Sequence, residues 1–324
     1  MTITSLPPWL EETWRSLMAR LVRNELPHAM LVCGDAGLGK RALADALVAS
    51  MLCESRDAQG FACGHCRACQ LLRAGSHPDR IFTSFELRDD GKPRSEITVD
   101  QIRALSQRLS LSSQFGGLQV VLVDPADRMN ASAANALLKT LEEPSASTVI
   151  ILISDTPSRL PATIRSRCQR IEAHAPPPAQ ARTWLGGQGI SPADADEALA
   201  ATLGNPGRAL LALSSDSLAL RAECRKDLLA LSGRRGDALA IAEAWSADRP
   251  AERLWHAGVL VRDEALRLAS GAGSTLGLTG AGEIPKLAAW FASANRSREL
   301  LSTQLRSDLV LLDLLHSWQM PRSR

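Results

Sequence analysis

The sequence lacks tyrosine altogether, and only 4% of its 324 residues are aromatic. Strands of all-β sandwiches and barrels are rich in aromatic and β-branched residues, so this composition argues against both architectures. Hydrophobic residues nevertheless make up 45% of the chain and charged residues 22%, as in an ordinary soluble protein. Because alanine and leucine dominate, we expect an aliphatic, mostly helical core spread over two or three compact units.

Long hydrophobic runs are missing as well. The run Val149–Ile153, for example, is far shorter than the ~20 apolar residues that a membrane helix needs. The first residues include Pro7, Pro8 and Glu11 where a signal peptide would have an apolar segment. We therefore expect a cytoplasmic protein.

The sequence also lacks a surplus of charge of one sign. The 37 Lys and Arg residues nearly balance the 35 Asp and Glu residues, which leaves a formal charge of +2. Such a chain has no overall field for holding nucleic acid, so any DNA binding has to be local. A zinc-dependent protein that binds DNA tightly by itself is disfavoured, because the sequence offers neither a basic groove nor aromatic stacking platforms.

Residues 1–175 alternate β-branched runs with amphipathic segments, the pattern of a parallel sheet flanked by helices. Pro176–Pro178 interrupts this pattern, and the rest is helical apart from a break at Gly271–Gly282. We predict an α/β domain over 1–175, a small helical unit over 176–210 and an all-α domain over 211–324. Strands are predicted at 29–33, 80–85, 119–124, 148–154 and 170–172, and helices at 10–22, 40–52, 99–109, 130–143, 179–186 and 192–203.

A glycine-rich segment follows the first predicted strand. Residues Gly34 to Lys40 read Gly-Asp-Ala-Gly-Leu-Gly-Lys and match the GxxxxGK pattern of a P-loop, between a strand and a helix. Backbone N–H groups at such a helix N-terminus cradle a polyphosphate, and Lys40 is expected to meet the terminal phosphates. The predicted nucleotide site contains Gly34, Gly37, Gly39, Lys40, Arg41 and Asp124.

Two groups that hydrolysis needs are missing from this P-loop. Active P-loop enzymes place Ser or Thr after the lysine to hold Mg²⁺, and this chain has Arg41. The apolar run Val120–Asp124 ends in the expected acid, but Pro125 stands where nucleotidases of the AAA+ type have a glutamate that orients the attacking water. We expect no ATP hydrolysis, whereas ATP or ADP binding stays open. In the alternative, Glu142 or Glu143 replaces the missing base.

Four of the seven cysteines crowd into the 17 positions from 53 to 69: Cys53, Cys63, Cys66 and Cys69. Four thiolates fill the tetrahedral shell of Zn²⁺, so the spacing predicts a structural zinc module. A redox CxxC pair is the rival interpretation, but it leaves two of the four unexplained; His65 is an alternative ligand. The dispersed cysteines are expected to be small buried hydrophobes: Cys33, Cys168 and Cys224.

The segment Ser158–Arg170 carries four arginines, of which Arg159 and Arg170 are expected to be solvated. Arg167 differs, because it lies just before the last short strand, at the end of the α/β domain, where a guanidinium could reach a neighbour's nucleotide. A planar guanidinium supplied in trans speeds phosphoryl transfer by about 10³ or more. Arg167 is the predicted trans arginine finger, and it needs no working ATP site beside it.

These features resemble one family, the delta-prime subunits of the bacterial DNA polymerase III clamp loader, which are AAA+ relatives. The resemblance covers most of residues 26–178. Asn135–Pro144 and Ser166–Cys168 are shared with the ATP-hydrolysing clamp-loader subunits, whereas Arg41 and Pro125 look like delta-prime. The matching stretches are Leu26-Pro27-His28-Ala29, Cys63-Gly64-His65-Cys66 with Cys69, His77-Pro78-Asp79, Asn135–Pro144 and Ser166-Arg167-Cys168.

The resemblance implies an AAA+ or RecA-like P-loop domain carrying the zinc module, then a helical lid and a C-terminal collar domain that joins an oligomer. It implies a non-catalytic subunit of the polymerase holoenzyme, in a ring-shaped hetero-pentamer that loads the sliding clamp onto primed DNA. Arg167 would act on ATP in the adjacent subunit, and Arg208 resembles the family's second nucleotide sensor or is a charge at a helix start. An ATP-hydrolysing clamp-loader subunit, or another P-loop motor, is the alternative function.

Overall fold

The computed structural model shows two compact units, residues 1–184 and 185–324, each with its own hydrophobic core. The boundary falls inside helix α7 (Pro178–Gly187). The predicted division into 1–175, 176–210 and 211–324 stays a prediction. The structure describes residues 5–86, 91, 94–145, 147–301, 303 and 305–319.

Five parallel strands form the sheet of the first unit, in the order β2-β3-β4-β1-β5. β1 and β4 pair in register, with Ala29 beside Ile150 and Cys33 beside Ser154. Every residue of β1, β3 and β4 is buried, as in strands that helices cover on both faces. The strands are β1 (Ala29–Cys33), β2 (Arg80–Thr83), β3 (Gln119–Val123), β4 (Thr148–Ser154) and β5 (Gln169–Glu172).

The strand order brings the predicted nucleotide site together. β1 lies between β4 and β5, while β2 starts again at the far edge of the sheet, so the winding direction changes after β1. Open α/β sheets bind ligands at the carboxyl ends of the strands near such a change. Because all strands are parallel, the segments that follow β1, β3 and β4 meet at this one edge.

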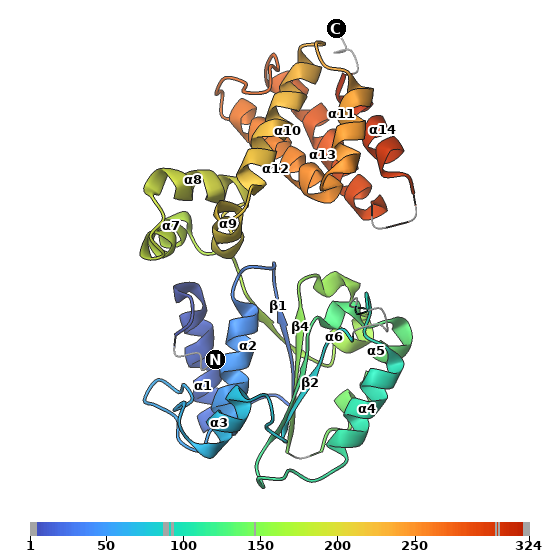
Figure 1. Cartoon of the computed structure of the whole chain (residues 1–324). Coiled ribbons are helices and arrows are strands. Elements are labelled where there is room, and N and C mark those ends of the chain that lie inside the picture. The colour runs from blue at the N-terminus through green and yellow to red at the C-terminus, as the bar shows by residue number, and fades with distance from the viewer. Residues whose placement is uncertain are drawn as a thin grey trace. The chain divides into compact units, whose positions relative to one another are not determined.

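Helices cover both faces of the sheet (Figure 1): α1 to α3 lie on one side and α4 to α6 on the other. The first side buries Trp14 and Leu47 against the sheet, and the second buries Ile102 and Leu137. The helices of this unit before α7 are α1 (Glu11–Val22), α2 (Lys40–Leu52), α3 (Arg67–Arg73), α4 (Val99–Leu109), α5 (Ala131–Glu142) and α6 (Ala162–Arg165), with 3-10 turns at Pro8–Leu10, Ala126–Arg128 and Pro157–Arg159.

Most predicted element bounds agree with the structure to within one or two residues. The strand predicted to reach Phe85 ends at Thr83, which is the last residue paired with β3. Asn130 is the N-cap of α5, and its side chain accepts from the N–H of Ala133 at 2.9 Å. Two short helices, α3 and α6, were not predicted. Four elements have the predicted bounds: 29–33, 148–154, 40–52 and 99–109.

In the part that the structure describes, the regular structure of the second unit is all helix. Its core includes Trp245, Trp290 and Trp318, and the last two meet edge to face at 5.2 Å. Buried Glu264 holds the glycine-rich break, since its carboxylate accepts from the N–H of Thr275 at 2.9 Å. None of the described helices combines the length and apolarity needed to span a bilayer. The helices after α7 are α8 (Pro192–Ala201), α9 (Pro206–Leu213), α10 (Ser217–Ser232), α11 (Ala238–Ala247), α12 (Pro250–Ala269), α13 (Ile284–Leu300) and α14 (Ser307–Gln319), with a 3-10 turn at Ala281–Glu283.

Candidate functional site

The P-loop between β1 and α2 has a backbone that requires glycine. Gly34, Gly37 and Gly39 have φ angles of +138°, +93° and +82°, a region that other residues rarely adopt. A Cβ atom on Gly34 would also lie 2.3 Å from the carbonyl oxygen of Ala173, which follows β5. The sequence motif and the backbone conformation therefore agree.

The P-loop lysine is already paired inside the protein. The Lys40 side chain is only 1% exposed, and its Nζ donates to the carbonyl oxygen of Asp35 at 3.1 Å. Nζ also donates to the carboxylate of Asp155, the residue directly after β4. A nucleotide phosphate would have to compete with this carboxylate for the ammonium group.

Arg41 lies between two carboxylates. Its Nε and Nη2 donate to the two oxygens of Asp124 at 2.8 and 2.9 Å, and its Nη1 and Nη2 donate to Asp155 at 3.2 and 2.9 Å. The hydrogen bonds with Asp155, and then with Asp124, raise the pKa of Arg41 above its ordinary value. Burial alone would raise the pKa of Asp155, but the bonds from Arg41 and Lys40 outweigh it and hold that pKa below its ordinary 3.8.

The charges of the four bonded side chains balance. Lys40 and Arg41 bring two positive charges, and Asp124 and Asp155 bring two negative ones. The Arg41 guanidinium thus binds Asp124, the acid that follows β3, from the sequence position where a P-loop hydroxyl would hold Mg²⁺. A cavity of about 400 Å³ adjoins the group, and Pro125 is part of its lining.

The alternative base predicted from the sequence lies elsewhere. Glu142 and Glu143 are at the end of α5, and neither is among the described residues that line the cavity beside Arg41. Glu142 instead binds Arg167. The structure therefore does not bring a substitute carboxylate from this pair to Asp124.

The predicted finger arginine is held by two groups from different helices. Nη2 of Arg167 lies 2.6 Å from Glu142 Oε1, and Nη1 donates to the carbonyl oxygen of Thr163 at 3.0 Å. The Arg167 side chain is 38% exposed, so it is partly open to solvent. Arg159 is exposed, and Arg170 forms an exposed ion pair with Glu172, as expected for solvated residues.

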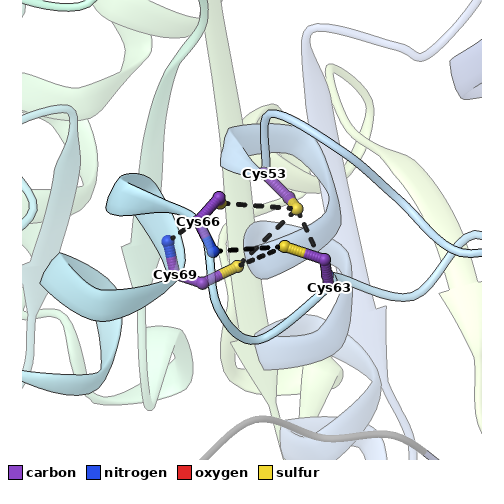
Figure 2. Close-up of side chains that lie close together, drawn as sticks. All are labelled: Cys53, Cys63, Cys66 and Cys69. Carbon is purple, nitrogen blue, oxygen red and sulfur yellow. Dashed lines mark hydrogen bonds between the residues drawn. The ribbon is translucent and has the colours of Figure 1, made fainter.

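The four clustered cysteines point toward one centre (Figure 2). Their sulfur atoms all lie within 4.8 Å of one another, with separations of 3.8 Å for Cys53–Cys66, 4.0 Å for Cys63–Cys69 and 3.6 Å for Cys53–Cys69. Four sulfurs bound to zinc at ~2.3 Å in a tetrahedron are about 3.8 Å apart. The cluster therefore has the donor set and the spacing of a closed ZnS₄ site.

Backbone N–H groups donate to sulfur atoms of this cluster and favour the thiolate at Cys63, whereas burial raises the pKa values of Cys53 and Cys69. The N–H groups of Cys63 and Cys66 donate at 3.3 Å to the sulfurs of Cys53 and Cys63, respectively. Backbone hydrogen bonds from His65 and then Cys66 lower the pKa of Cys63 to about 6. The His65 ring is exposed and its Nδ1 lies 2.9 Å from the Cys63 carbonyl oxygen, outside the group of sulfurs. The remaining cysteines are buried, as predicted: Cys33, Cys168 and Cys224.

Comparison with known proteins shows the family to which the chain belongs. A family model described as "DNA polymerase III, delta subunit" matches residues 9–176. A Pseudomonas aeruginosa protein named DNA polymerase III subunit delta' is 46% identical over 201 residues, which are 61% of this chain and 58% of the relative. An Escherichia coli protein of the same name is 35% identical over 322 residues, 95% of this chain and 93% of the relative. The chain belongs to the delta-prime family of DNA polymerase III subunits.

Its function is thus that of a clamp-loader subunit in DNA replication. The chain is also similar to a differently named subunit: a Bacillus subtilis protein named DNA polymerase III subunit tau is 31% identical over 162 residues, 50% of this chain and 27% of that one. A solved DNA polymerase III gamma subunit-related protein from Thermotoga maritima is 16% identical, covers 94% of this chain and 98% of its own, and has a TM-score of 0.47.

One residue predicted for the delta-prime nucleotide site, Arg208, lies in the second unit. Its guanidinium carbon is 5.1 Å from the ring centroid of Trp255, and Arg298 lies at the same distance from that ring. Cation–π contact with Trp255 gives Arg208 a packing role within its own unit. Its role as a nucleotide sensor stays a prediction.

Sequence analysis missed Asp155, the group that links Lys40 with Arg41. The available signal was its position: Asp155 follows buried strand β4 as Asp124 follows buried strand β3. Both acids therefore lie at the edge where the P-loop begins. Arg41 and Asp155 are more than 110 positions apart in the sequence. They come together because β3, β4 and β1 are neighbours in the sheet.

Proposed function

We propose that this delta-prime chain is a clamp-loader subunit that does not hydrolyse ATP and that acts on ATP bound to a neighbouring subunit. The contact of Arg41 with both Asp124 and Asp155 carries the proposal. Those are the carboxylates at the strand ends beside the P-loop, and hydrolysis needs an acid there to be free for Mg²⁺. The Arg41 guanidinium is bonded to both carboxylates, so neither is free to act as a ligand of Mg²⁺.

The P-loop lysine supports the same conclusion. Lys40 is buried and bound to Asp155, so ATP or ADP would have to break that pair before its phosphates met the ammonium group. The glutamate that would orient a water molecule is replaced by Pro125, which has no acid–base group. We expect weak nucleotide binding at most, and no turnover.

Arg167 is the group that we assign to the neighbour's ATP. It is partly exposed, it is permanently charged, and its planar fork matches phosphate oxygens. Such an arginine speeds the reaction in the adjacent site by stabilising charge that develops on the transferred phosphate.

The assembly that this role requires is a ring of clamp-loader subunits. We propose a hetero-pentamer in which this chain is one member, with the sliding clamp and primed DNA contacted through the complex. The sulfurs of Cys53, Cys63, Cys66 and Cys69 would hold a structural zinc, which leaves no open coordination position for catalysis.

Two measurements test the proposal. The purified chain should show no Mg²⁺-dependent ATP turnover, and turnover that disappears in Lys40→Ala would contradict a non-hydrolysing subunit. In the complex reconstituted with its partner subunits, Arg167→Ala should lower turnover at the facing ATP site by about 10³-fold. Arg170→Ala, which removes another exposed arginine nearby, should leave turnover unchanged; an unaltered rate in Arg167→Ala would remove the finger role.

A further inference from the structure

The guanidinium of Arg167 has two fixed anchors. One is Glu142 Oε1, 2.6 Å from Nη2, at the last residue of α5; the other is the carbonyl oxygen of Thr163, 3.0 Å from Nη1, in α6. A guanidinium has five N–H groups, and each anchor engages one nitrogen. The described residues place no further partner on this side chain, so N–H groups remain for a phosphate.

The position of Glu142 is not explained by the stability of its own helix. It is the C-terminal residue of α5, and a second acid, Glu143, is the C-cap. The C-terminal end of a helix carries partial negative charge, which disfavours acidic side chains there. The cation of Arg167 offsets this repulsion, and a cation is itself favoured near a helix C-terminus, so the ion pair makes the placement of Glu142 tolerable.

The end of α5 is also a firm support. The helix is packed through Leu137 and Leu141, which are buried against the sheet, and Pro144 prevents it from continuing. Glu142 therefore projects from a defined point, although the ion pair itself is partly exposed, at 38% for Arg167 and 48% for Glu142.

We infer that Glu142 is a positioning residue: together with the Thr163 carbonyl it holds the Arg167 guanidinium in place for the ATP of the adjacent subunit. This inference rests on the proposed finger role of Arg167. A free arginine side chain samples many rotamers, and restricting it before ATP arrives lowers the cost of reaching the transition state. Because Arg167 keeps unused N–H groups, it can bind phosphate while it remains bonded to both anchors.

The test uses the reconstituted clamp loader and steady-state ATP kinetics. Glu142→Ala should lower kcat by about threefold to fivefold, the most that an exposed ion pair contributes. The KM for ATP should stay unchanged, because the finger acts on the transition state. Glu142→Gln keeps an acceptor oxygen and should restore most of the rate. Glu143→Ala removes the neighbouring acid, which has no contact with Arg167 among the described residues, and should have no effect.

The decisive comparison is the double variant. In an Arg167→Ala background, Glu142→Ala should cause no further loss, because a positioning residue has nothing left to position. An equal loss in both backgrounds would overturn the inference, since Glu142 would then act independently of Arg167. A faster Glu142→Ala enzyme would also overturn it, by showing that the carboxylate masks the finger. If Arg167→Ala alone lowers the rate and Glu142→Ala does not, only this inference fails; if neither does, the finger role fails as well.

Discussion

Asp155 shows how a single carboxylate changes the character of a P-loop. It binds the ammonium group of Lys40, which is 1% exposed, and the guanidinium of Arg41. A buried ammonium group without a partner would be costly, and in nucleotide-binding proteins phosphates supply that partner. Here a residue of the chain itself does so, and the site is complete without a ligand.

We therefore predict that Asp155→Asn lowers the free energy of unfolding by about 2 kcal/mol at pH 7, because it leaves Lys40 and Arg41 with less compensation. The folded pKa of Asp155 lies below its ordinary 3.8, so its contribution is present above that value and is lost as the pH falls through the folded pKa. Urea unfolding from pH 7 into the acid range should show the difference between parent and variant shrinking.

The control for this prediction is Asp100→Asn, which removes an 85% exposed carboxylate paired with Arg103 in the same unit. It should change the free energy of unfolding by less than ~0.5 kcal/mol. A parent-to-variant difference for Asp155→Asn that is absent at pH 7, or that does not vary with acid pH, would contradict the argument.

At the scale of elements, α3 depends on the cysteine cluster. Seven residues are too few for a helix to be stable by itself in water. Its N-cap is Cys66, whose sulfur accepts from the N–H of Cys69 at 3.4 Å and also lies among the four clustered sulfurs. A metal bound there would fix the start of the helix and the turns around Gly60 and Gly64 at once.

Cys66→Ser separates these two contributions, because serine is a good N-cap but a poor zinc ligand. We expect the variant to lose zinc and its thermal midpoint to fall by about 5 °C or more. Metal analysis and a melting curve measure both effects. His65→Ala, which changes an exposed neighbour of the cluster, should retain the metal and the midpoint; a parent protein that contains no zinc would refute the site.

Sequence patterns predicted the strands and most helices of the sheet unit well and missed its two short helices, α3 and α6. β1 and β4 are continuous apolar runs and α5 has a clear N-cap at Asn130, so their limits could be read from local signals. α3 and α6 have seven and four residues, which is too short for a helical period to show. Contacts such as Glu142–Arg167 join residues distant in sequence, and no local pattern predicts them.

At the scale of the whole molecule, the chain has separate cores for its two units. The sheet unit buries residues on both faces of its strands, while the helical unit has a core of its own that includes Leu228 and Trp245. Separate cores of this kind unfold as separate cooperative units when few contacts join them.

We predict two transitions in scanning calorimetry, each sensitive to variants in one unit only. Cys66→Ser should shift the transition of the sheet unit. Leu228→Ala, which truncates a fully buried side chain of α10, should shift the other by the equivalent of about 2–5 kcal/mol. If either variant shifted the midpoints of both transitions equally, the unfolding of the two units would be coupled, which would contradict this prediction.

Neighbouring parts of the chain crowd two of the P-loop glycines. Gly34 has no room for even a methyl group beside the backbone after β5, and a methyl group on Gly39 would press on Leu10 and Pro7 at 3.1 Å. Both constraints come from neighbouring polypeptide and would persist in a chain that never meets a triphosphate. A glycine-rich P-loop sequence can therefore be required by packing within the fold, even where the loop does not support nucleotide hydrolysis.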